Sequence, residues 1–223
     1  MGANAGTSSL AGVRGVRPEP LAEAGRDGDQ LSASRRSPRR ILIVEDDDPT
    51  WRALERSLRS HAWRCVHATS VAEARSLLCG DFDAILIDLN LGDGGRGEDV
   101  LDLLASRPTP VAAVVLSGQG KGAGANALEL DGVPYLDKPP VFATLRATLD
   151  EEVELTRMVN ARGLVGLGAR IEKGTLRAMM GKLRETVGNQ SRAALGLGLP
   201  RTTLREKMET YGLRSASFKR RKT

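Results

Sequence analysis

Residues 41–49 have the sequence Ile-Leu-Ile-Val-Glu-Asp-Asp-Asp-Pro, in which a short apolar run is followed at once by acids and a proline. Such a run is typical of a parallel strand that is buried on both faces of a sheet. Asp48 and Pro49 favour a helix start, with Asp48 as the N-cap, and apolar residues three and four apart continue the helix to about residue 61. The stretch therefore predicts a strand followed by a helix, the unit of an α/β fold.

The same cycle continues along the chain. Further strands are expected at 63–67, 84–87, 111–116 and 135–136, and further helices at 70–78, 98–105, 125–130 and from 141 onward. Strands that alternate with helices form a parallel sheet with helices on both faces. We therefore predict an α/β doubly wound, five-stranded parallel sheet.

Charge divides the chain into parts that suit different partners. Residues 41–150 have a net charge of −7, whereas residues 151–223 have a net charge of +9. A basic segment of this kind is expected to meet a polyanion. The first 40 residues are rich in Ala, Gly, Ser and Arg and have no apolar periodicity, so we expect a disordered tail there.

The composition also excludes several classes of protein. Cys65 and Cys79 are the only cysteines, and neither lies near a second cysteine or a histidine cluster, so we expect neither a disulfide framework nor a zinc site. No apolar stretch is long enough for a membrane span, and residues 1–40 lack the apolar region of a secretory signal. We expect a cytoplasmic protein with no membrane partner.

Polar side chains follow the expected strands at their carboxyl ends. Glu45 and Asp46 follow the first strand, Asp88 the third, Ser117 the fourth and Lys138 the fifth. In a doubly wound sheet, ligands bind beyond the carboxyl ends of the strands, at the point where the strand order reverses. We therefore expect these side chains to converge on one site.

The chemistry of this set predicts a phosphorylation site. Three carboxylates repel one another unless a divalent cation lies among them, and Mg2+ prefers such oxygen ligands. Asp88 can then attack a phosphorus atom to form an acyl phosphate, while Mg2+ and Lys138 neutralise the phosphoryl oxygens. Ser117 can donate a hydrogen bond to the bound phosphoryl group and draw its loop inward.

The motifs Ile-Val-Glu45-Asp46, Ile-Leu-Ile-Asp88, Val-Leu-Ser117-Gly and Tyr135-Leu-Asp-Lys138-Pro139 resemble those of bacterial response-regulator receiver domains, which have a flavodoxin-like fold. The resemblance covers residues 41 to about 150. It implies a cognate histidine kinase as phosphodonor and a cis peptide bond before the proline. Carried over to this chain, it implies Asp88 as phospho-acceptor; Glu45, Asp46, Asp88 and Asn90 as Mg2+ ligands, the last through its backbone carbonyl; and Ser117, Lys138 and Tyr135 as the phosphate-binding and switch residues. The glycines between 118 and 124 depart from the family and predict a short or mobile fourth helix.

The basic C-terminal segment predicts helices only, at 175–187, 190–197 and from 200 or 201 to 211. Two short helices joined by a tight turn form a helix-turn-helix, whose second helix enters the major groove of DNA. Residues 175–213, with Gly-Asn-Gln-Ser-Arg-Ala-Ala-Leu at 188–195, resemble the C-terminal domain of the factor for inversion stimulation (Fis). The resemblance implies double-stranded DNA as partner, contacted by Asn189, Arg201, Thr203, Arg205 and Lys207. It also implies a homodimer through the first of these helices, by way of Leu176, Met179, Met180, Leu183 and Val187.

The predicted organisation is a disordered tail at 1–40, a receiver domain at 41–158, a linker at 159–171, a Fis-type domain at 172–215 and a basic tail at 216–223. The function it predicts is a phosphorylation-controlled, DNA-binding transcriptional regulator of a two-component system, and not an enzyme. Two alternatives stay open. One is a Mg2+-dependent phosphatase that uses Asp88, although Asn90 stands where that class has a second acid. The other is a nucleoid-type architectural DNA-binding protein with a passive receiver.

Overall fold

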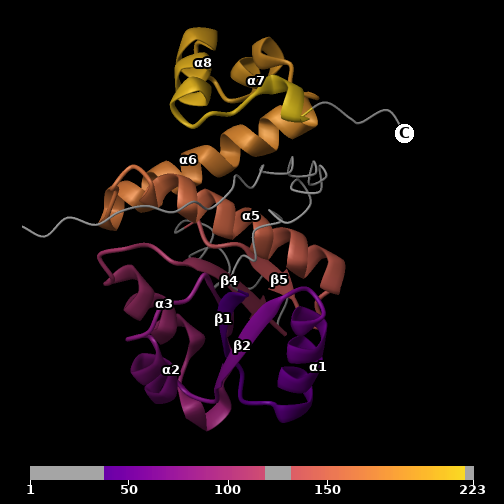
Figure 1. Ribbon diagram of the computed structural model, residues 1–223, viewed down its shortest axis with the longest axis vertical. Coiled ribbons are helices and arrows are strands. Elements are labelled where there is room, and N and C mark those ends of the chain that lie inside the picture. The colour runs from indigo at the N-terminus through magenta and orange to yellow at the C-terminus, as the bar shows by residue number, and fades with distance from the viewer. Residues whose placement is uncertain (1–37, 119–131, 219–223) are drawn as a thin grey trace, which may run out of the picture. The chain divides into compact units, whose positions relative to one another are not determined.

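The structure, a computed structural model, describes residues 38–118 and 132–218 and contains a parallel sheet with the strand order β2-β1-β3-β4-β5. The predicted sheet, with its five parallel strands, is confirmed (Figure 1). The strands are β1 (Arg39–Val44), β2 (Trp63–Ala68), β3 (Ala84–Asp88), β4 (Ala112–Ser117) and β5 (Tyr135–Asp137). The helix predicted at 125–130 lies outside the described residues.

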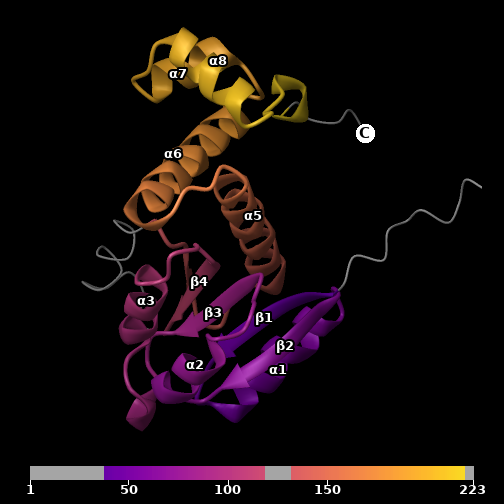
Figure 2. The ribbon, with the colours of Figure 1, turned by 60° about the vertical axis from the view of Figure 1, so that its left-hand side comes forward.

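Helices cover both faces of the sheet (Figures 1 and 2). They are α1 (Asp48–Arg59), α2 (Val71–Leu77), α3 (Gly97–Ala105) and α5 (Phe142–Asn160), with a short 3-10 turn η1 (Gly92–Gly94) before α3. Side chains alternate along β1, so Ile41 and Ile43 pack with α1 and α5 while Leu42 and Val44 pack with α2 and α3. This double burial explains the continuous apolar run at the start of the fold.

The strand register positions the predicted site. Val44 of β1 pairs with Ile87 of β3, so the residues that follow them, Glu45 and Asp88, emerge side by side. The strand order reverses at β1 and β3, which is where doubly wound sheets bind ligands. The backbone alone thus brings the acidic residues together.

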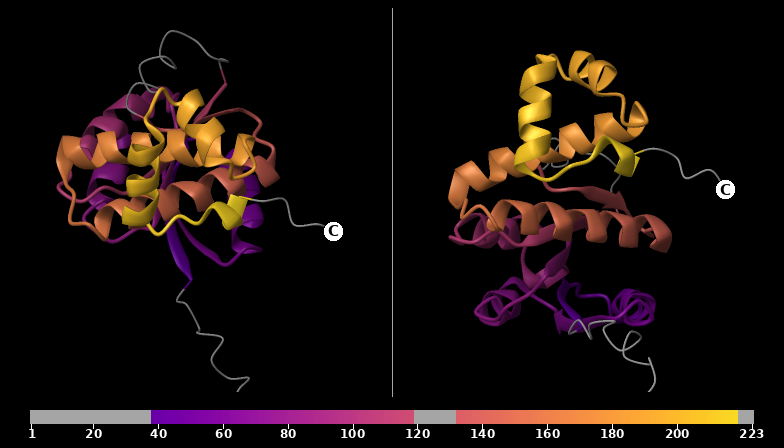
Figure 3. Two further views of the ribbon diagram at one scale, coloured as in Figure 1. Left: turned by 90° about the horizontal axis from the view of Figure 1, so that it is seen from above. Right: turned by 45° about the horizontal axis from the view of Figure 1, so that its top comes forward.

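The C-terminal part of the described chain is helical, as predicted, and is drawn in orange and yellow in Figure 3. It contains α6 (Gly166–Glu185), α7 (Gln190–Gly196), α8 (Arg201–Thr210) and a 3-10 turn η2 (Ser215–Phe218). Met179 and Leu183 of α6 pack with Ala193 of α7 and with Leu204 and Met208 of α8. These contacts form a separate small core under the two short helices.

The predicted linker is wrong in extent. Helix α6 begins at Gly166 rather than near residue 175, and α5 continues to Asn160, so only residues 161–165 separate the two helices. The linker is predicted from Gly163, Gly166 and Gly168, and a glycine inside a helix costs about 1 kcal/mol relative to alanine. Burial of Ala169 and Leu176 against α5 outweighs that cost.

The predicted tails are also slightly too long at their inner ends. Strand β1 begins at Arg39, because Arg39 already pairs with Trp63 of β2; its guanidinium also lies 5.4 Å from the Trp63 ring, and the Arg40 backbone N–H donates to Asp83 at 2.9 Å. At the other end, Phe218 packs against the helical core, so the predicted basic tail does not begin at 216. Residues 1–37 and 219–223 of the predicted tails lie outside the described residues.

The N-cap of α1 is Asp47 rather than Asp48. Asp47 has extended backbone angles and its carboxylate accepts a hydrogen bond from the Thr50 backbone N–H at 2.9 Å. Asp48 is already helical and forms an ion pair with Arg52 at 2.8 Å. The predicted helix is present, with its start displaced by one residue.

Candidate functional site

Three carboxylates converge at the carboxyl edge of the sheet, as predicted. Glu45, Asp46 and Asp88 each place one oxygen within 4.8 Å of the others. Glu45 and Asp88 are buried, with 1% and 5% of their surface exposed, whereas Asp46 is exposed to solvent. The cluster therefore has a buried floor and one open side.

Lys138 bridges the two buried carboxylates. Its Nζ lies 2.7 Å from Glu45 Oε2 and 2.8 Å from Asp88 Oδ2. The loop that carries it is fixed because the Lys138 backbone N–H donates to the Ser117 carbonyl at 2.7 Å, and the Lys138–Pro139 peptide bond is cis, as predicted. The ammonium group thus stands where it can neutralise charge on Asp88.

The cluster carries more negative than positive charge. Burial raises the pKa of Glu45, and the nearby Asp88 charge adds to this rise, although the hydrogen bond and charge of Lys138 oppose it. Burial works to lower the pKa of Lys138, but its hydrogen bonds to Asp88 and Glu45 prevail and the pKa is raised, so the ammonium stays charged at neutral pH. Three carboxylates facing one ammonium leave a site that fits a hard divalent cation.

The donor set also fits Mg2+ in kind. Only oxygen ligands are offered by Glu45, Asp46 and Asp88, and the exposed side at Asp46 leaves room for the waters that Mg2+ retains. Asn90 adjoins the cluster, since its backbone N–H donates to Asp88 Oδ1 at 3.2 Å. A ligand role for its carbonyl stays a prediction.

The two predicted switch residues lie on the strands beyond Asp88. Leu116 pairs with Asp88 across β3 and β4, so Ser117 lies one residue further along the same edge, where it is 5% exposed. Tyr135 opens β5, pairs with Val115 and is half-buried. Their response to a phosphoryl group stays a prediction.

Two glycines shape the site and were not predicted to do so. Gly92 has a φ of +51°, and a Cβ there would lie 3.0 Å from Asp46 Oδ2. A Cβ on Gly97 would lie 2.2 Å from the Asp88 carbonyl oxygen, so only glycine lets the start of α3 lie this close to the end of β3. The signal was present in the sequence as a glycine-rich loop at 92–97.

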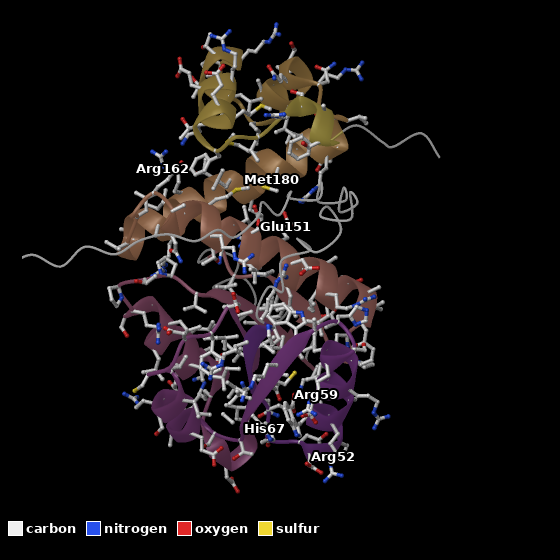
Figure 4. The ribbon with its side chains drawn as sticks, in the orientation of Figure 1. Arg52, Arg59, His67, Glu151, Arg162 and Met180 are labelled. Carbon is white, nitrogen blue, oxygen red and sulfur yellow. The ribbon has the colours of Figure 1, made fainter. Side chains whose placement is uncertain are left out.

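His67 supports the site from β2. Its Nε2 lies 2.8 Å from the Glu45 carbonyl oxygen, and its ring stacks on Trp51 with centroids 4.2 Å apart and planes at 4°. Figure 4 labels this histidine. No sequence spacing connects His67 with Glu45, because the contact arises only from the pairing of β1 with β2.

The helix-turn-helix places two predicted DNA contacts on one exposed side of α8. Arg201 is the first residue of the helix and is exposed; Arg205 lies one turn later with 60% of its side chain exposed. Asn189 is exposed as the N-cap of α7, where its side chain accepts from the Arg192 backbone N–H at 3.1 Å. These three residues are accessible to a ligand.

Thr203 and Lys207 occupy another side of α8. They are four residues apart and half-buried, and Lys207 Nζ lies 3.0 Å from Glu172 Oε1 on α6. Lys207 therefore differs from Arg205, whose ion pair with Glu209 is longer, at 3.6 Å, and is exposed to solvent.

A buried ion cluster joins α5 to α6. Glu152 of α5 is 1% exposed; its Oε2 lies 2.8 Å from Lys173 Nζ, and its Oε1 accepts a hydrogen bond from Arg177 Nε at 3.0 Å. Burial lowers the pKa of Lys173, against the opposing effect of Glu152. The single carboxylate of Glu152 thus forms ion pairs with two cations, Lys173 and Arg177.

Apolar and exposed ionic contacts surround this cluster. Leu155 of α5 packs with Leu176 and Met180 of α6, and Arg184 pairs with Glu151 at 2.6 Å. Figure 4 labels Met180 and Glu151. Four of the five residues implied for a dimer, Leu176, Met179, Met180 and Leu183, are therefore buried within the chain, whereas Val187 is 45% exposed.

Comparison with known proteins identifies both parts of the chain. Residues 41–150 match the response regulator receiver domain, and residues 176–211 match the family described as bacterial regulatory protein, Fis family. The receiver domain of a putative LuxO repressor protein from Vibrio parahaemolyticus has a TM-score of 0.51 at 21% identity, over 55% of this chain and 95% of that one. This last similarity concerns the fold alone.

Two curated relatives extend the match. The acid tolerance regulatory protein ActR of Sinorhizobium medicae (strain WSM419) is 35% identical over 144 residues, which are 61% of this chain and 71% of the relative. The photosynthetic apparatus regulatory protein RegA of Cereibacter sphaeroides is 34% identical over 103 residues, 45% of this chain and 55% of the relative. The chain belongs to the response regulators, and within them it joins a receiver domain to a Fis-family DNA-binding domain. Among the described helices, none combines the length and apolar character needed to cross a membrane.

Proposed function

We propose that this chain is a two-component transcriptional regulator that accepts a phosphoryl group on Asp88 and changes its binding to DNA in response. The observation that carries the proposal is the convergence of Glu45, Asp46 and Asp88 beside Lys138, in a chain that also has a Fis-family domain. The phosphodonor is a cognate histidine kinase, and the partner of the C-terminal domain is double-stranded DNA in the cytoplasm.

Each residue of the cluster has a defined task in this reaction. An Asp88 carboxylate oxygen forms a bond to phosphorus as the bond from phosphorus to the donor histidine breaks, and the released imidazole takes up a proton. Lys138 holds positive charge beside Asp88, while Glu45, Asp46 and Asp88, with the carbonyl of Asn90, would hold Mg2+. When bound, Mg2+ supplies the charge neutralisation that the transferred group requires.

The switch depends on Ser117, which we expect to donate its hydroxyl to the new phosphoryl group, with Tyr135 turning inward as the loop closes. Ser117→Ala should still be phosphorylated at Asp88 but should lose most of the change in DNA affinity that phosphorylation produces. Fluorescence anisotropy with a labelled duplex, before and after treatment with acetyl phosphate, measures this change. Ser117→Thr keeps the hydroxyl and should respond as the parent does; an equal response in Ser117→Ala would refute the coupling.

The exposed arginine at the start of α8 is expected to read a base. Arg201→Ala should remove about 1 to 3 kcal/mol of discrimination between a specific site and random DNA, because a bidentate arginine contact to guanine is worth this amount. Thr203→Ala should weaken both complexes alike if it contacts phosphate. A site selected in vitro and a shuffled duplex provide the two ligands; a specificity ratio unchanged by Arg201→Ala would contradict the assignment.

We propose that DNA is bound by a homodimer formed through the C-terminal domain, which reads an inverted repeat. The face of α6 that the Fis resemblance implies for pairing is packed within the chain, on α5 and under α7 and α8. Of the residues implied for the dimer, only Val187 is exposed, so a dimer that keeps these contacts must use further residues of the domain as well. Analytical ultracentrifugation with and without acetyl phosphate tests the oligomeric state.

Two alternative functions make different predictions. A phosphatase that uses Asp88 would turn over a generic phosphate ester at a rate that depends on Asp88, whereas we expect no such turnover because Asn90 stands where that class has its proton donor. An architectural protein with a passive receiver would not be labelled by acetyl phosphate. Stoichiometric labelling without ester turnover therefore favours the regulator over both.

A further inference from the structure

The Glu172 carboxylate on α6 accepts hydrogen bonds from two side chains at the C-terminal end of α8. Its Oε1 accepts a hydrogen bond from the Tyr211 hydroxyl at 2.6 Å, and Lys207 Nζ donates to both carboxylate oxygens, at 3.0 and 3.3 Å. Arg162, which lies between α5 and α6, places its guanidinium 5.2 Å from the centre of the Tyr211 ring (Figure 4). Four side chains thus close a contact between α6 and α8.

The electrostatics of this contact keep Glu172 anionic. Burial acts to raise its pKa, but hydrogen bonds from Tyr211 and Lys207, with the charges of Lys207 and Arg162, hold the pKa below its ordinary value. Burial, together with the hydrogen bond to Glu172, raises the pKa of Tyr211 to about 12. At neutral pH the Glu172 carboxylate is therefore ionised, and it lies 3.0 Å from Lys207 Nζ.

Helix geometry separates Lys207 from the exposed arginines. Lys207 and Tyr211 are four residues apart and share the side of the α8 segment that faces Glu172. Arg205 lies on another side, with 60% of its side chain exposed and only a 3.6 Å pair with Glu209, whereas 33% of the Lys207 side chain is exposed. For Lys207 to reach a DNA phosphate, it must give up two charge-assisted hydrogen bonds.

We propose that Glu172 is a positioning residue that fixes the recognition helix on α6 and withholds Lys207 from the DNA backbone. The inference rests on the proposed DNA binding and deepens it, since it removes Lys207 from the contacts that the Fis resemblance implies. In this chain Lys207 orients α8 on α6, whereas Arg201 and Arg205 lie on the side of α8 that contacts DNA.

A matched pair of charge removals tests the role of Lys207. Each phosphate contact contributes about 0.9 to the slope of log affinity against log salt concentration. In the full chain, with a random-sequence duplex, Arg205→Met should lower that slope by about 0.9, whereas Lys207→Met should leave it unchanged. A loss of about 0.9 in Lys207→Met, equal to that in Arg205→Met, would overturn the inference and leave DNA binding intact.

A variant that removes the negative charge paired with Lys207 tests the role of Glu172 directly. Glu172→Gln keeps an acceptor for the Tyr211 hydroxyl but removes the charge that holds Lys207, so the salt slope should rise by about 0.9 as the freed ammonium reaches phosphate. The rise should vanish in the double variant Glu172→Gln, Lys207→Met. A structural role alone would weaken binding without raising the slope, and an unchanged slope in Glu172→Gln would therefore overturn the proposal. A parent chain that binds no duplex at low salt would overturn the proposed function as well.

Discussion

Asp88→Asn should reduce labelling by radioactive acetyl phosphate to background, whereas the parent chain should take up about one phosphoryl group per chain when Mg2+ is present. The amide nitrogen of asparagine is not a nucleophile toward phosphorus, so the acyl phosphate cannot form. Lys138 and the other two carboxylates stay in place, and the loss therefore reports the acceptor itself. Filter binding of the labelled protein over time measures the result.

Neighbouring acids provide matched controls for this experiment. Asp46→Asn should slow labelling because it removes one oxygen ligand from the metal cluster. Asp47→Asn makes the same chemical change one residue later, outside the three-carboxylate cluster; asparagine still caps a helix, so labelling should be unaffected. Radioactivity that persists in Asp88→Asn and maps to another side chain would show that the acceptor has been misassigned.

The acidic cluster could be predicted because its geometry follows from strand topology. Parallel strands end at the same edge, and a continuous apolar run marks where each strand stops. The register of Val44 with Ile87 then places the next residues, Glu45 and Asp88, side by side. Residue type and strand order were sufficient, and no long-range packing had to be known.

The junction between α5 and α6 could not be predicted in the same way. Glu152, Lys173 and Arg177 have the composition of a solvated helix surface, yet Glu152 and Lys173 are buried. Their burial depends on the docking of two helices, and Gly163, Gly166 and Gly168 favoured a linker at the place where α6 begins. Local propensity was overridden by tertiary packing.

The contact between Glu172 and Lys207 was missed for a related reason. The Fis resemblance assigns Lys207 to DNA from its position in the motif, but Glu172 lies 35 residues away along the chain. Only the packing of α8 on α6 shows that the lysine has an anionic partner. A motif fixes the helix that meets DNA more securely than it fixes the partner of each side chain on that helix.

Glu152→Gln should lower the free energy of unfolding by about 3 to 5 kcal/mol, because it leaves Lys173 buried without its anionic partner and deprives Arg177 of a charged acceptor. Gln and Glu are nearly equal in volume, so the loss reports charge rather than packing. Urea unfolding followed by circular dichroism measures the change. The same variant should loosen α5 from α6, seen as faster amide hydrogen exchange along α6.

Lys173→Met is the decisive control because the cluster contains two cations and one carboxylate. Removing Lys173 leaves Glu152 paired with Arg177, so the loss of stability in Lys173→Met should be small, or the variant should be more stable than the parent.

The pH dependence of stability gives a second readout. Since the pKa of Lys173 is lowered on folding, the unfolded chain binds more protons, and the parent gains stability as pH rises toward 10.5. The raised pKa of Tyr211 opposes this gain in the parent and in Lys173→Met alike. The difference in pH-dependent stability between the two proteins therefore reports the contribution of Lys173 alone. Equal destabilisation by Glu152→Gln and Lys173→Met, with no such pH difference, would show that the cluster contributes through packing and not through its charge balance.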